Sequence, residues 1–379
     1  MFLIDNCNII YLDKIEKGSV LIENGKIRKI NPKDKKNIKV LDGKDLYLSP
    51  GFIDVHIHGT SGCDTMDGTF ESLNTISKTI AKHGTTSFLP TTMTVSIESI
   101  KKAIKAISAA KKIGTEGASI LGTHLEGPFI SENAIGAQNP NFIQAPSIQL
   151  FKEIVGEHEN DITCVTLAPE VKGAKELIEY LSSKNITSSI GHTNANYEEA
   201  MLGIKHGISH STHLFNAMTP LHHRKPGVVG AIYDSDITTE TISDGIHIAY
   251  PTLRISYKIK GIDKVLLVTD AMMACCMPNG KYSLGGQDVF VKDGAARLDN
   301  GSLAGSILTL DKAIKNVYDN SSYKLNEIIK MATYNPAKHC KVDEKKGLIK
   351  EGYDADLVLF DENINIKTTI VNGTIVFSE

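Results

Sequence analysis

The sequence has no excess of positive charge and no long apolar run. Its 379 residues carry 41 lysines and arginines against 44 aspartates and glutamates, a net charge of −3 with histidine neutral. This balance lacks the electrostatic footprint with which proteins bind nucleic acids or anionic membranes. No apolar stretch approaches the roughly 20 residues that a membrane-spanning helix needs. We therefore expect a globular protein with neither a nucleic-acid nor a membrane partner.

Several short motifs are also missing. There is no C-x-x-C pair and the six cysteines are scattered, so we expect reduced thiols in a cytoplasmic protein. Cys275 and Cys276 are adjacent, but neither has a further cysteine at ligand spacing, so no redox or metal site is predicted there. The N-terminus, MFLIDNCNII, carries Asp5 and no basic leader, unlike a signal peptide. No G-x-x-x-x-G-K-[ST] loop is present, so nucleotide chemistry is not indicated.

What is present is a rhythm of strands and helices. Apolar residues make up 41% of the chain and charged residues 22%, as is typical of globular proteins. Helical periodicity predicts helices over residues 71–84, 96–114, 173–185, 196–207, 250–261, 309–319 and 326–340, with Ser96 as the N-cap of the second. Strand-like segments alternate with them at residues 52–59, 85–92, 119–127, 162–170, 186–193, 208–215, 237–247 and 264–270. Eight such units predict an α/β fold of the (β/α)8, TIM-barrel type.

The two ends of the chain differ from the middle. Residues 1–49 and 341–379 consist of short strand-like segments separated by turns, and Asn372-Gly373 is a strong hairpin signal. Neither segment can bury a core of its own. We therefore predict that 1–49 and 341–379 pair into one small β-sandwich domain, into which a barrel domain of residues 50–340 is inserted.

The segment LSPGFIDVHIHG, residues 48–59, places two histidines after an apolar strand. His56 and His58 alternate with Val55 and Ile57, so both imidazoles lie on one face. A single histidine there would usually be an ordinary buried polar residue. Two rings on one face can converge on one metal ion, and the metal hypothesis then depends on what the other strands contribute.

The other predicted strands contribute more groups of this kind. In a parallel barrel the functional residues lie at the carboxyl ends of the strands. Glu126, His192, His213 and Asp270 each follow a predicted strand there. Any one of them could be a local turn or cap residue, but the same position in so many strands indicates a shared site. Histidine with carboxylate suits zinc or ferrous iron better than calcium or magnesium.

The remaining histidines do not fit this pattern. His210 precedes His213 by three residues, so alternation predicts that it faces the other way. His124 lies two residues before Glu126 and could share its face, in a supporting role. The others are predicted to be solvated in helix ends or loops: His83, His158, His206, His222, His223 and His339.

The motifs HLEGPF, GHTNA, THLFNAM, SDGIH, TDAM and LAGSILTLD, in this order, resemble those of the amidohydrolase superfamily and, within it, of the N-acetylglucosamine-6-phosphate deacetylases. The resemblance extends from about residue 45 to residue 375. It implies a (β/α)8 barrel with a β-sandwich, one or two divalent metals, and hydrolysis of N-acetyl-D-glucosamine 6-phosphate to D-glucosamine 6-phosphate and acetate. Such a reaction belongs to amino-sugar catabolism and cell-wall sugar recycling.

The resemblance also implies roles for individual residues. It assigns metal ligation to Glu126, His192 and His213, and acid–base catalysis to Asp270. Since His56 and His58 are both present, a second metal is implied, with Glu126 bridging. Substrate contacts are implied for Gln138, Asn216, Ala217, Arg224 and His247. In this family the arginine reaches the neighbouring active site, which implies a homodimer. Some members place a histidine where this chain has Gln138, which can donate a hydrogen bond to the acetyl carbonyl but carries no charge.

The same residues make chemical sense without the resemblance. Amide hydrolysis needs an activated water and a polarised carbonyl, which a metal can supply, and a carboxylate such as Asp270 can move the proton to the leaving nitrogen. Three alternatives stay open. One is an N-acetylgalactosamine-6-phosphate deacetylase. Another is a different amidohydrolase, although residues 162–170 lack the bridging lysine of cyclic-amide hydrolases. The third is an inactive scaffold, although this chain keeps every ligand.

Overall fold

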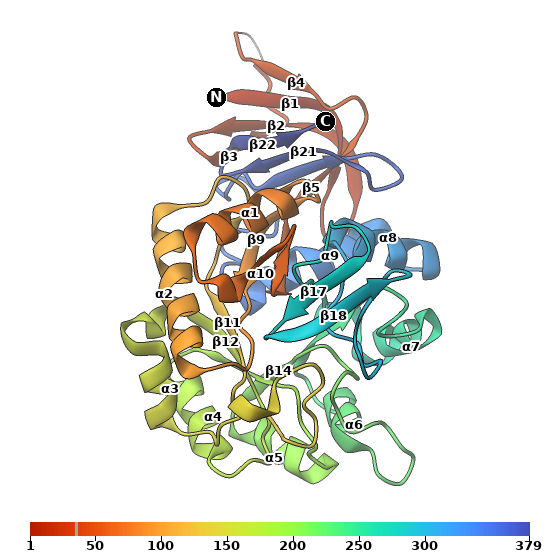
Figure 1. Cartoon of the computed structure of the whole chain (residues 1–379). Coiled ribbons are helices and arrows are strands. Elements are labelled where there is room, and N and C mark those ends of the chain that lie inside the picture. The colour runs from red at the N-terminus through yellow and green to blue at the C-terminus, as the bar shows by residue number, and fades with distance from the viewer. Residues whose placement is uncertain (35–36) are drawn as a thin grey trace.

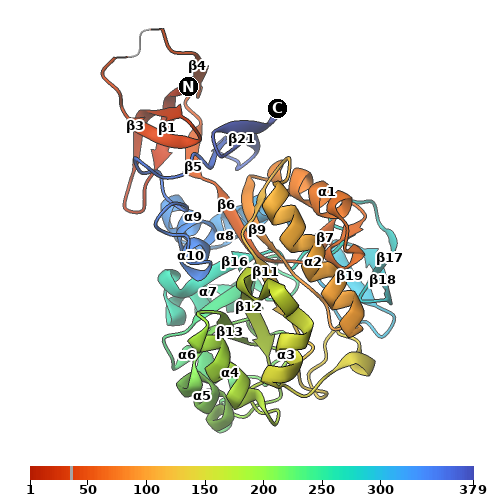
Figure 2. The same cartoon turned by 90° about the vertical axis from the view of Figure 1, so that its left-hand side faces the viewer.

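Eight parallel strands surround the centre of the computed structural model, which describes residues 1–34 and 37–379. Each of the eight strands predicted from the sequence is confirmed in type, and all are shorter than predicted; the seventh ends at Ile242 rather than at His247. Figures 1 and 2 show helices packed around the outside of these strands. The strands are β6 (Phe52–Ile57), β9 (Thr85–Pro90), β11 (Thr123–Glu126), β12 (Ile162–Leu167), β13 (Thr187–Ile190), β14 (Ile208–Ser211), β15 (Thr238–Ile242) and β16 (Val265–Val268).

Hydrogen bonds close these strands into a TIM-type barrel. One row runs β11-β12-β13-β14-β15-β16, and a second pairs β9 with β6. The rows meet where the Thr92 amide donates to the His124 carbonyl at 3.0 Å and the Asp270 amide donates to the His56 carbonyl at 2.9 Å. The Thr269 hydroxyl also donates to the buried Asp54 carboxylate at 2.6 Å. The closure therefore brings the ends of β6 and β16 together.

The helices cover the barrel through their apolar faces. Ser96 is the N-cap of α2, as predicted, since its side chain accepts the Ser99 amide. The helix predicted over 326–340 divides at Thr333, whose ψ of −76° with φ of −131° is not helical. The helices are α1 (Phe70–Ala81), α2 (Ile97–Ile113), α3 (Ile148–Val155), α4 (Ala174–Ser183), α5 (Tyr197–His206), α6 (Gly227–Tyr233), α7 (Tyr250–Lys260), α8 (Leu310–Asn320), α9 (Leu325–Ala332) and α10 (Tyr334–His339).

Shorter elements complete the barrel. Among the described residues, no helix combines the length and apolar character needed to cross a bilayer. The 3-10 helices are η1 (Thr65–Asp67), η2 (Pro140–Phe142), η3 (Gly156–Asp161) and η4 (Ile262–Lys264). The short strands β7 (Gly59–Thr60) and β8 (Cys63–Asp64) pair with each other, and β10 (Ser119–Ile120) extends the edge of β9.

The two ends of the chain pair with each other in one sheet at the top of Figure 1. Its order is β22-β21-β20-β5-β1-β2-β3, with β4 beside β1. Asn372 and Gly373 form the predicted hairpin turn, with φ of 47° and 73°. The Ala355 amide, just before β20, donates to the Gly25 carbonyl in the turn between β2 and β3 at 2.9 Å. The strands are β1 (Phe2–Ile10), β2 (Ile15–Glu23), β3 (Lys26–Ile30), β4 (Val40–Asp42), β5 (Tyr47–Pro50), β20 (Leu357–Phe360), β21 (Ile366–Val371) and β22 (Thr374–Ser378).

The helices α3 and α6 and a three-stranded sheet were not predicted from the sequence. Between β16 and α8 the chain forms a three-stranded antiparallel sheet of β17 (Gly280–Leu284), β18 (Gln287–Lys292) and β19 (Ala295–Leu298). Gly285-Gly286 and Asp293-Gly294 form its two turns with positive φ. These pairs are the hairpin signal that could have revealed it. The sheet matters for function because Leu284 and the segment after β19 border the pocket at the barrel mouth.

Candidate metal centre and pocket

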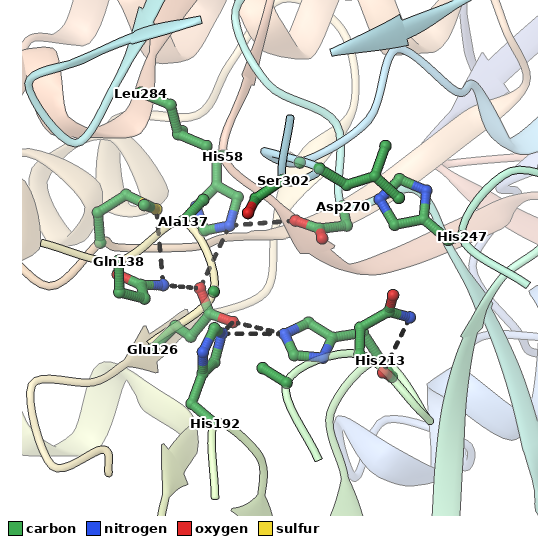
Figure 3. A pocket seen from close by; sticks show the side chains of 16 residues that line it. His58, Glu126, Ala137, Gln138, His192, His213, His247, Asp270, Leu284 and Ser302 are labelled. Carbon is green, nitrogen blue, oxygen red and sulfur yellow. Dashed lines mark hydrogen bonds and ion pairs between the residues drawn. The ribbon is translucent and has the colours of Figure 1, made fainter. Parts of the chain in front are cut away.

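A pocket of about 320 Å³ opens at the carboxyl ends of the barrel strands (Figure 3). The closure of the barrel and the insertion after β16 together form its walls. Every site residue predicted from the sequence borders it except two. His56 is buried beneath it, and Arg224 is exposed on the loop before α6. The predicted residues that line it are His58, Glu126, Gln138, His192, His213, Asn216, Ala217, His247 and Asp270.

Three side chains on one side of the pocket point at a common centre. The Nε2 atoms of His192 and His213 lie 3.1 Å apart, and they lie 3.3 and 3.2 Å from Glu126 Oε1. Ligands bound about 2.0–2.1 Å from a tetrahedral zinc lie roughly 3.3–3.4 Å from one another. The spacing of these three donor atoms therefore fits one metal ion.

A second set of donors adjoins the first. His56 Nε2 and His58 Nε2 lie 3.4 Å apart, and Asp270 Oδ1 lies 3.5 and 3.2 Å from them. Glu126 Oε2 is 3.3 Å from His58 Nε2. Glu126 therefore borders both sets, because Oε1 also lies 3.5 Å from His56 Nε2.

The hydrogen bonds behind the histidines fix which ring nitrogen is free. Nδ1 of His56 contacts Glu240 Oε2 at 2.9 Å, Nδ1 of His58 the Thr91 carbonyl at 3.2 Å, and Nδ1 of His192 the Ala134 carbonyl at 3.1 Å. A carbonyl or carboxylate can only accept, so each Nδ1 carries the hydrogen. Nε2 is then the ring atom that faces the centre, which is the arrangement of metal-ligating histidines.

The backbone at these positions is in a conformation that side chains rarely adopt. His192, His213 and Asp270 have φ of 47°, 27° and 49°. Left-handed backbone costs a non-glycine residue of order 1–3 kcal/mol and is found mainly where function requires it. These three residues come just after the ends of β13, β14 and β16. The left-handed backbone there turns each side chain toward the pocket.

The family is decided by comparison with known proteins. Residues 47–376 match the Amidohydrolase family. The chain belongs to the amidohydrolase family. N-acetylglucosamine-6-phosphate deacetylase of Lysinibacillus sphaericus is 41% identical over 362 residues, which cover 95% of this chain and 93% of the relative. N-acetylgalactosamine-6-phosphate deacetylase of Escherichia coli O157:H7 is 33% identical over 360 residues, which cover 95% and 94%. The crystal structure of N-acetylglucosamine-6-phosphate deacetylase from Pasteurella multocida superposes with a TM-score of 0.94 at 34% identity, covering 99% of both chains.

Electrostatics in this amidohydrolase favour ionised carboxylates beside the histidines. Burial opposes ionisation of Glu126, but His56, His192 and His213 hold the pKa of Glu126 well below its usual range. The pKa of Asp270 is lowered in the same way: burial opposes ionisation, and His56 and His58 outweigh it. Two buried carboxylates thus carry negative charge toward the centre, as ligands of a divalent cation do.

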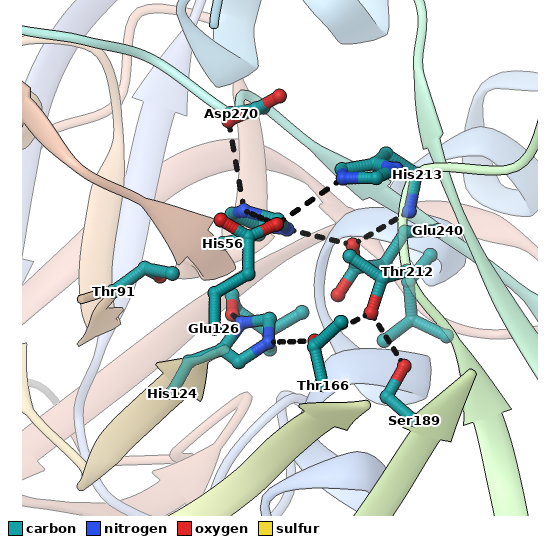
Figure 4. Close-up of polar contacts among 12 residues, drawn as sticks. His56, Thr91, His124, Glu126, Thr166, Ser189, Thr212, His213, Glu240 and Asp270 are labelled. Carbon is teal, nitrogen blue, oxygen red and sulfur yellow. Dashed lines mark hydrogen bonds and ion pairs between the residues drawn. The ribbon is translucent and has the colours of Figure 1, made fainter. Parts of the chain in front are cut away.

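Sequence reasoning missed Glu240, which lies under the amidohydrolase site (Figure 4). Glu240 is fully buried in β15. Its carboxylate accepts from His56 Nδ1 and from the His213 amide at 3.0 Å, and contacts His210 Nε2 at 3.2 Å. It therefore orients residues of both donor sets. The signal in the sequence that could have revealed Glu240 is its position inside the strand ITTETI. A buried carboxylate without partners would lower stability, so partners should have been sought for it.

Two predictions about histidines were wrong. His210 was expected to face away, yet it lies inside the barrel with Glu240. Alternation holds only within a strand, and β14 ends at Ser211, so the turn that carries His213 follows its own geometry. His339 was expected to be solvated, yet it is 8% exposed and its ring centroid lies 4.2 Å from that of His210.

His124 and Gln138 were also predicted near the site, and both are hydrogen-bonded there. His124 lies below His56, where Nδ1 contacts the Val55 carbonyl at 3.1 Å and Nε2 the Thr166 hydroxyl at 2.7 Å. Gln138 accepts the Thr94 amide at 2.7 Å and donates to Glu126 Oε2 at 2.7 Å, so its amide holds the bridging carboxylate.

His247, one of the residues expected to contact the sugar phosphate, lies across the pocket from Gln138 (Figure 3). His247 Nδ1 contacts Asp244 Oδ2 at 2.6 Å, so Nε2 is the atom left for a ligand. The Asn216 side chain donates to the His213 carbonyl at 3.3 Å. Arg224 lies 2.8 Å from His223 at the surface. No lysine or arginine is among the described residues that line the pocket.

Proposed function

We propose that this amidohydrolase hydrolyses N-acetyl-D-glucosamine 6-phosphate to D-glucosamine 6-phosphate and acetate. The observation that carries the proposal is the pair of adjoining donor sets, bridged by Glu126 and bordered by Asp270, at the floor of one pocket. The names of the similar proteins supply the substrate class. The deacetylase from Lysinibacillus sphaericus and the Pasteurella multocida structure favour the gluco epimer. The relative from Escherichia coli keeps the galacto epimer as the second candidate.

The proposed cofactor is zinc or iron, one or two ions per chain. Glu126, His192 and His213 would hold one ion, and His56, His58 and Glu126 the other. A bound divalent ion lowers the pKa of a coordinated water and polarises a carbonyl. The protein's part is to aim Nε2 of His56, His58 and His192 inward, which the acceptors at their Nδ1 atoms do.

Asp270 is the proposed acid–base residue. Its carboxylate faces the pocket at 8% exposure, so it reaches solvent, and its Oδ1 lies beside His58. Ionised Asp270 can accept a proton from the attacking water and return it to the leaving nitrogen. Gln138 is proposed to hold Glu126 in position; a direct contact of Gln138 with the acetyl group stays a prediction.

The phosphate is proposed to bind at the other end of the pocket. His247 Nε2 and the backbone turn at Asn216 and Ala217 offer hydrogen-bonding groups there, and a dianion also needs a cation. Since the pocket lining of the described residues offers neither lysine nor arginine, we propose that Arg224 of a second subunit supplies it in a homodimer. The exposure of Arg224 supports this arrangement.

A direct test is acetate release by the metal-loaded protein from both N-acetylhexosamine 6-phosphate epimers. We expect the gluco substrate to give the higher kcat/KM. A higher value for the galacto substrate would select the second candidate, and no release from either would support an inactive scaffold.

Removing the first pair of histidines should change the metal content. We expect His56→Ala/His58→Ala to lose one of two metals and to keep the ion at Glu126, His192 and His213. Elemental analysis on protein of known concentration measures this. Because His56→Ala also removes one of the buried partners of Glu240, His58→Ala alone is the control. If the double variant kept two metals, these histidines would not be ligands.

Subunit exchange tests the placement of Arg224. Arg224→Ala should raise KM for the phosphorylated substrate roughly 10- to 100-fold, the value of one charge-assisted contact. A heterodimer of Arg224→Ala and Asp270→Asn subunits, purified by two tags, should recover about half the wild-type activity, since one site has both residues. No recovery in verified heterodimers would place Arg224 in its own subunit's site.

We also propose a division of the chain into two domains. Residues 50–340 form the catalytic barrel, and residues 1–49 with 341–379 form a small β-sandwich that closes on itself. The meeting of Gly25 with Ala355 and the shared apolar core of β1, β2, β20 and β21 support the sandwich. The scattered cysteines support a cytoplasmic location.

A further inference from the structure

A second cluster of reactive side chains lies outside the pocket. Cys276 Sγ is 3.5 Å from His83 Nε2, and His83 Nδ1 is 3.0 Å from Asp311 Oδ2. Cys275 Sγ lies 3.7 Å from Cys276 Sγ. The cysteines follow β16, His83 follows α1 and Asp311 begins α8, so the fold brings these groups together from three distant segments. None of them borders the pocket, and the proposed function does not use them.

The two thiols have opposite surroundings. Cys275 is 2% exposed, and its sulfur lies 3.5 and 3.4 Å from the carbonyl oxygens of Ile307 and Leu308. Carbonyl oxygens repel a thiolate, so Cys275 stays a thiol. Cys276 is exposed and faces the imidazole of His83, with a φ of 63°. An imidazolium beside a sulfur stabilises the thiolate, and a carboxylate behind the imidazole stabilises the imidazolium.

The ionisation equilibria agree with this geometry. The hydrogen bond from Cys275 and the neighbouring His83 outweigh burial and lower the pKa of Cys276 to about 4. Burial disfavours the charged form of His83, but Asp311 and Cys276 raise the pKa of His83 to about 9. A cavity of about 10 Å³ bordered by His83, Cys275 and Cys276 is near the smallest that admits a water-sized molecule.

We propose that Cys276 and Cys275 form a peroxide-reactive pair, in which the Cys276 thiolate attacks and the Cys275 thiol resolves. The Cys276 sulfur takes one oxygen from hydrogen peroxide, and the other leaves as hydroxide, which becomes water on protonation. The Cys275 thiol then loses its proton and its sulfur displaces the new hydroxyl group, which leaves as water. In sum, two thiols and one peroxide give one disulfide and two waters.

Oxidation would reach the metal centre through the backbone. The Cys275 carbonyl accepts from the Ser61 amide and the Thr60 hydroxyl, both at 2.9 Å. In the same loop the Ala271 carbonyl accepts from the His58 amide at 2.9 Å. Joining the sulfurs requires them to approach from 3.7 Å to about 2 Å, which must move this loop. We therefore expect the disulfide to displace Asp270 and His58 and to lower turnover.

Alkylation of Cys276 tests the ion pair without any assay of activity. In wild-type protein its rate should change less than about twofold between pH 5.5 and 7.5, because the thiolate is already formed. In His83→Gln the rate should rise at least severalfold over the same range, because the sulfur loses the imidazolium and keeps only the hydrogen bond from Cys275. Peptide mass spectrometry with Cys63 as internal reference measures it. A steep wild-type profile would overturn the proposal.

Peroxide treatment tests the pairing. Zinc-loaded protein should be used, because ferrous iron itself reacts with peroxide. Wild type should lose two hydrogens within the 275–276 peptide, Cys275→Ser should hold a sulfenic acid trappable on Cys276, and Cys276→Ser should show neither. Oxidation of Cys63 or Cys340 at an equal rate would contradict the assignment.

The effect on turnover rests on the proposed function and is measured separately. Deacetylation by the wild type should fall on oxidation and return with dithiothreitol, while Cys276→Ser keeps its activity throughout. If the disulfide forms and activity does not change, the thiol site stands and its coupling to the metal centre is wrong. If unoxidised protein has no deacetylase activity at all, the proposed function fails and the thiol chemistry is judged from the mass spectra alone.

Discussion

Asp270→Asn is expected to lower kcat by roughly 10²–10⁴-fold, the range for loss of general acid–base catalysis. Asparagine keeps the shape of the side chain but cannot carry the proton from water to the leaving nitrogen. KM should change little, because the phosphate contacts and most of the metal donors remain. The experiment measures kcat, metal content and melting temperature on one preparation, since Asp270 Oδ1 also adjoins His56 and His58.

The competing explanation for Asp270 is that it caps a helix, a role that asparagine fills equally well. In the described residues the next helix after β16 is α8, whose N-cap is Thr309, so Asp270 has no helix to cap. Asp64→Asn is a matched control, because Asp64 is a buried N-cap near the site and the exchange should leave kcat near the wild-type value. A folded, metal-replete Asp270→Asn enzyme with normal kcat would reject the assignment.

Removing the 6-phosphate from the substrate should lower kcat/KM by about 10³-fold or more. Arg224, His247 and the amides near Asn216 would lose their partner together. Contacts of this charge-assisted kind contribute roughly 1.5–3 kcal/mol each, and about 4.1 kcal/mol corresponds to a factor of 10³. The measurement compares N-acetylglucosamine with its 6-phosphate on the same enzyme.

Comparing wild type with Arg224→Ala on both sugars separates a loss of phosphate binding from a loss of folding or assembly. The variant should lose activity on the phosphorylated sugar and change little on the unphosphorylated one, because without a phosphate there is nothing for the guanidinium to bind. Equal losses on both substrates would show that Arg224 acts through folding or assembly. Comparable kcat/KM for the two sugars with wild-type enzyme would reject the phosphate site itself.

The barrel and most of the metal donors could be predicted from local sequence. Period-two apolar segments alternate with helical ones, and in a parallel barrel every strand delivers its last residues to the same rim. That rule places Glu126, His192, His213 and Asp270 together without any knowledge of distances. Strand alternation, applied to the same segment, fails for His210. It was expected to face away from the site, but the turn after β14 does not continue the alternation of the strand.

The short distances that decide the chemistry depend on the tertiary structure alone. Glu240 orients His56 from 184 residues away, and His83 meets Cys276 across 193 residues. A hydrogen bond forms only within about 3 Å, and periodicity carries no information on that scale between distant segments. The sequence by itself determined the barrel, its order of strands and the rim on which the ligands lie. Only the folded chain decided which carboxylate or carbonyl holds Nδ1 of His56, His58 and His192. It also decided which of two adjacent thiols faces an imidazole, because side-chain packing sets those contacts.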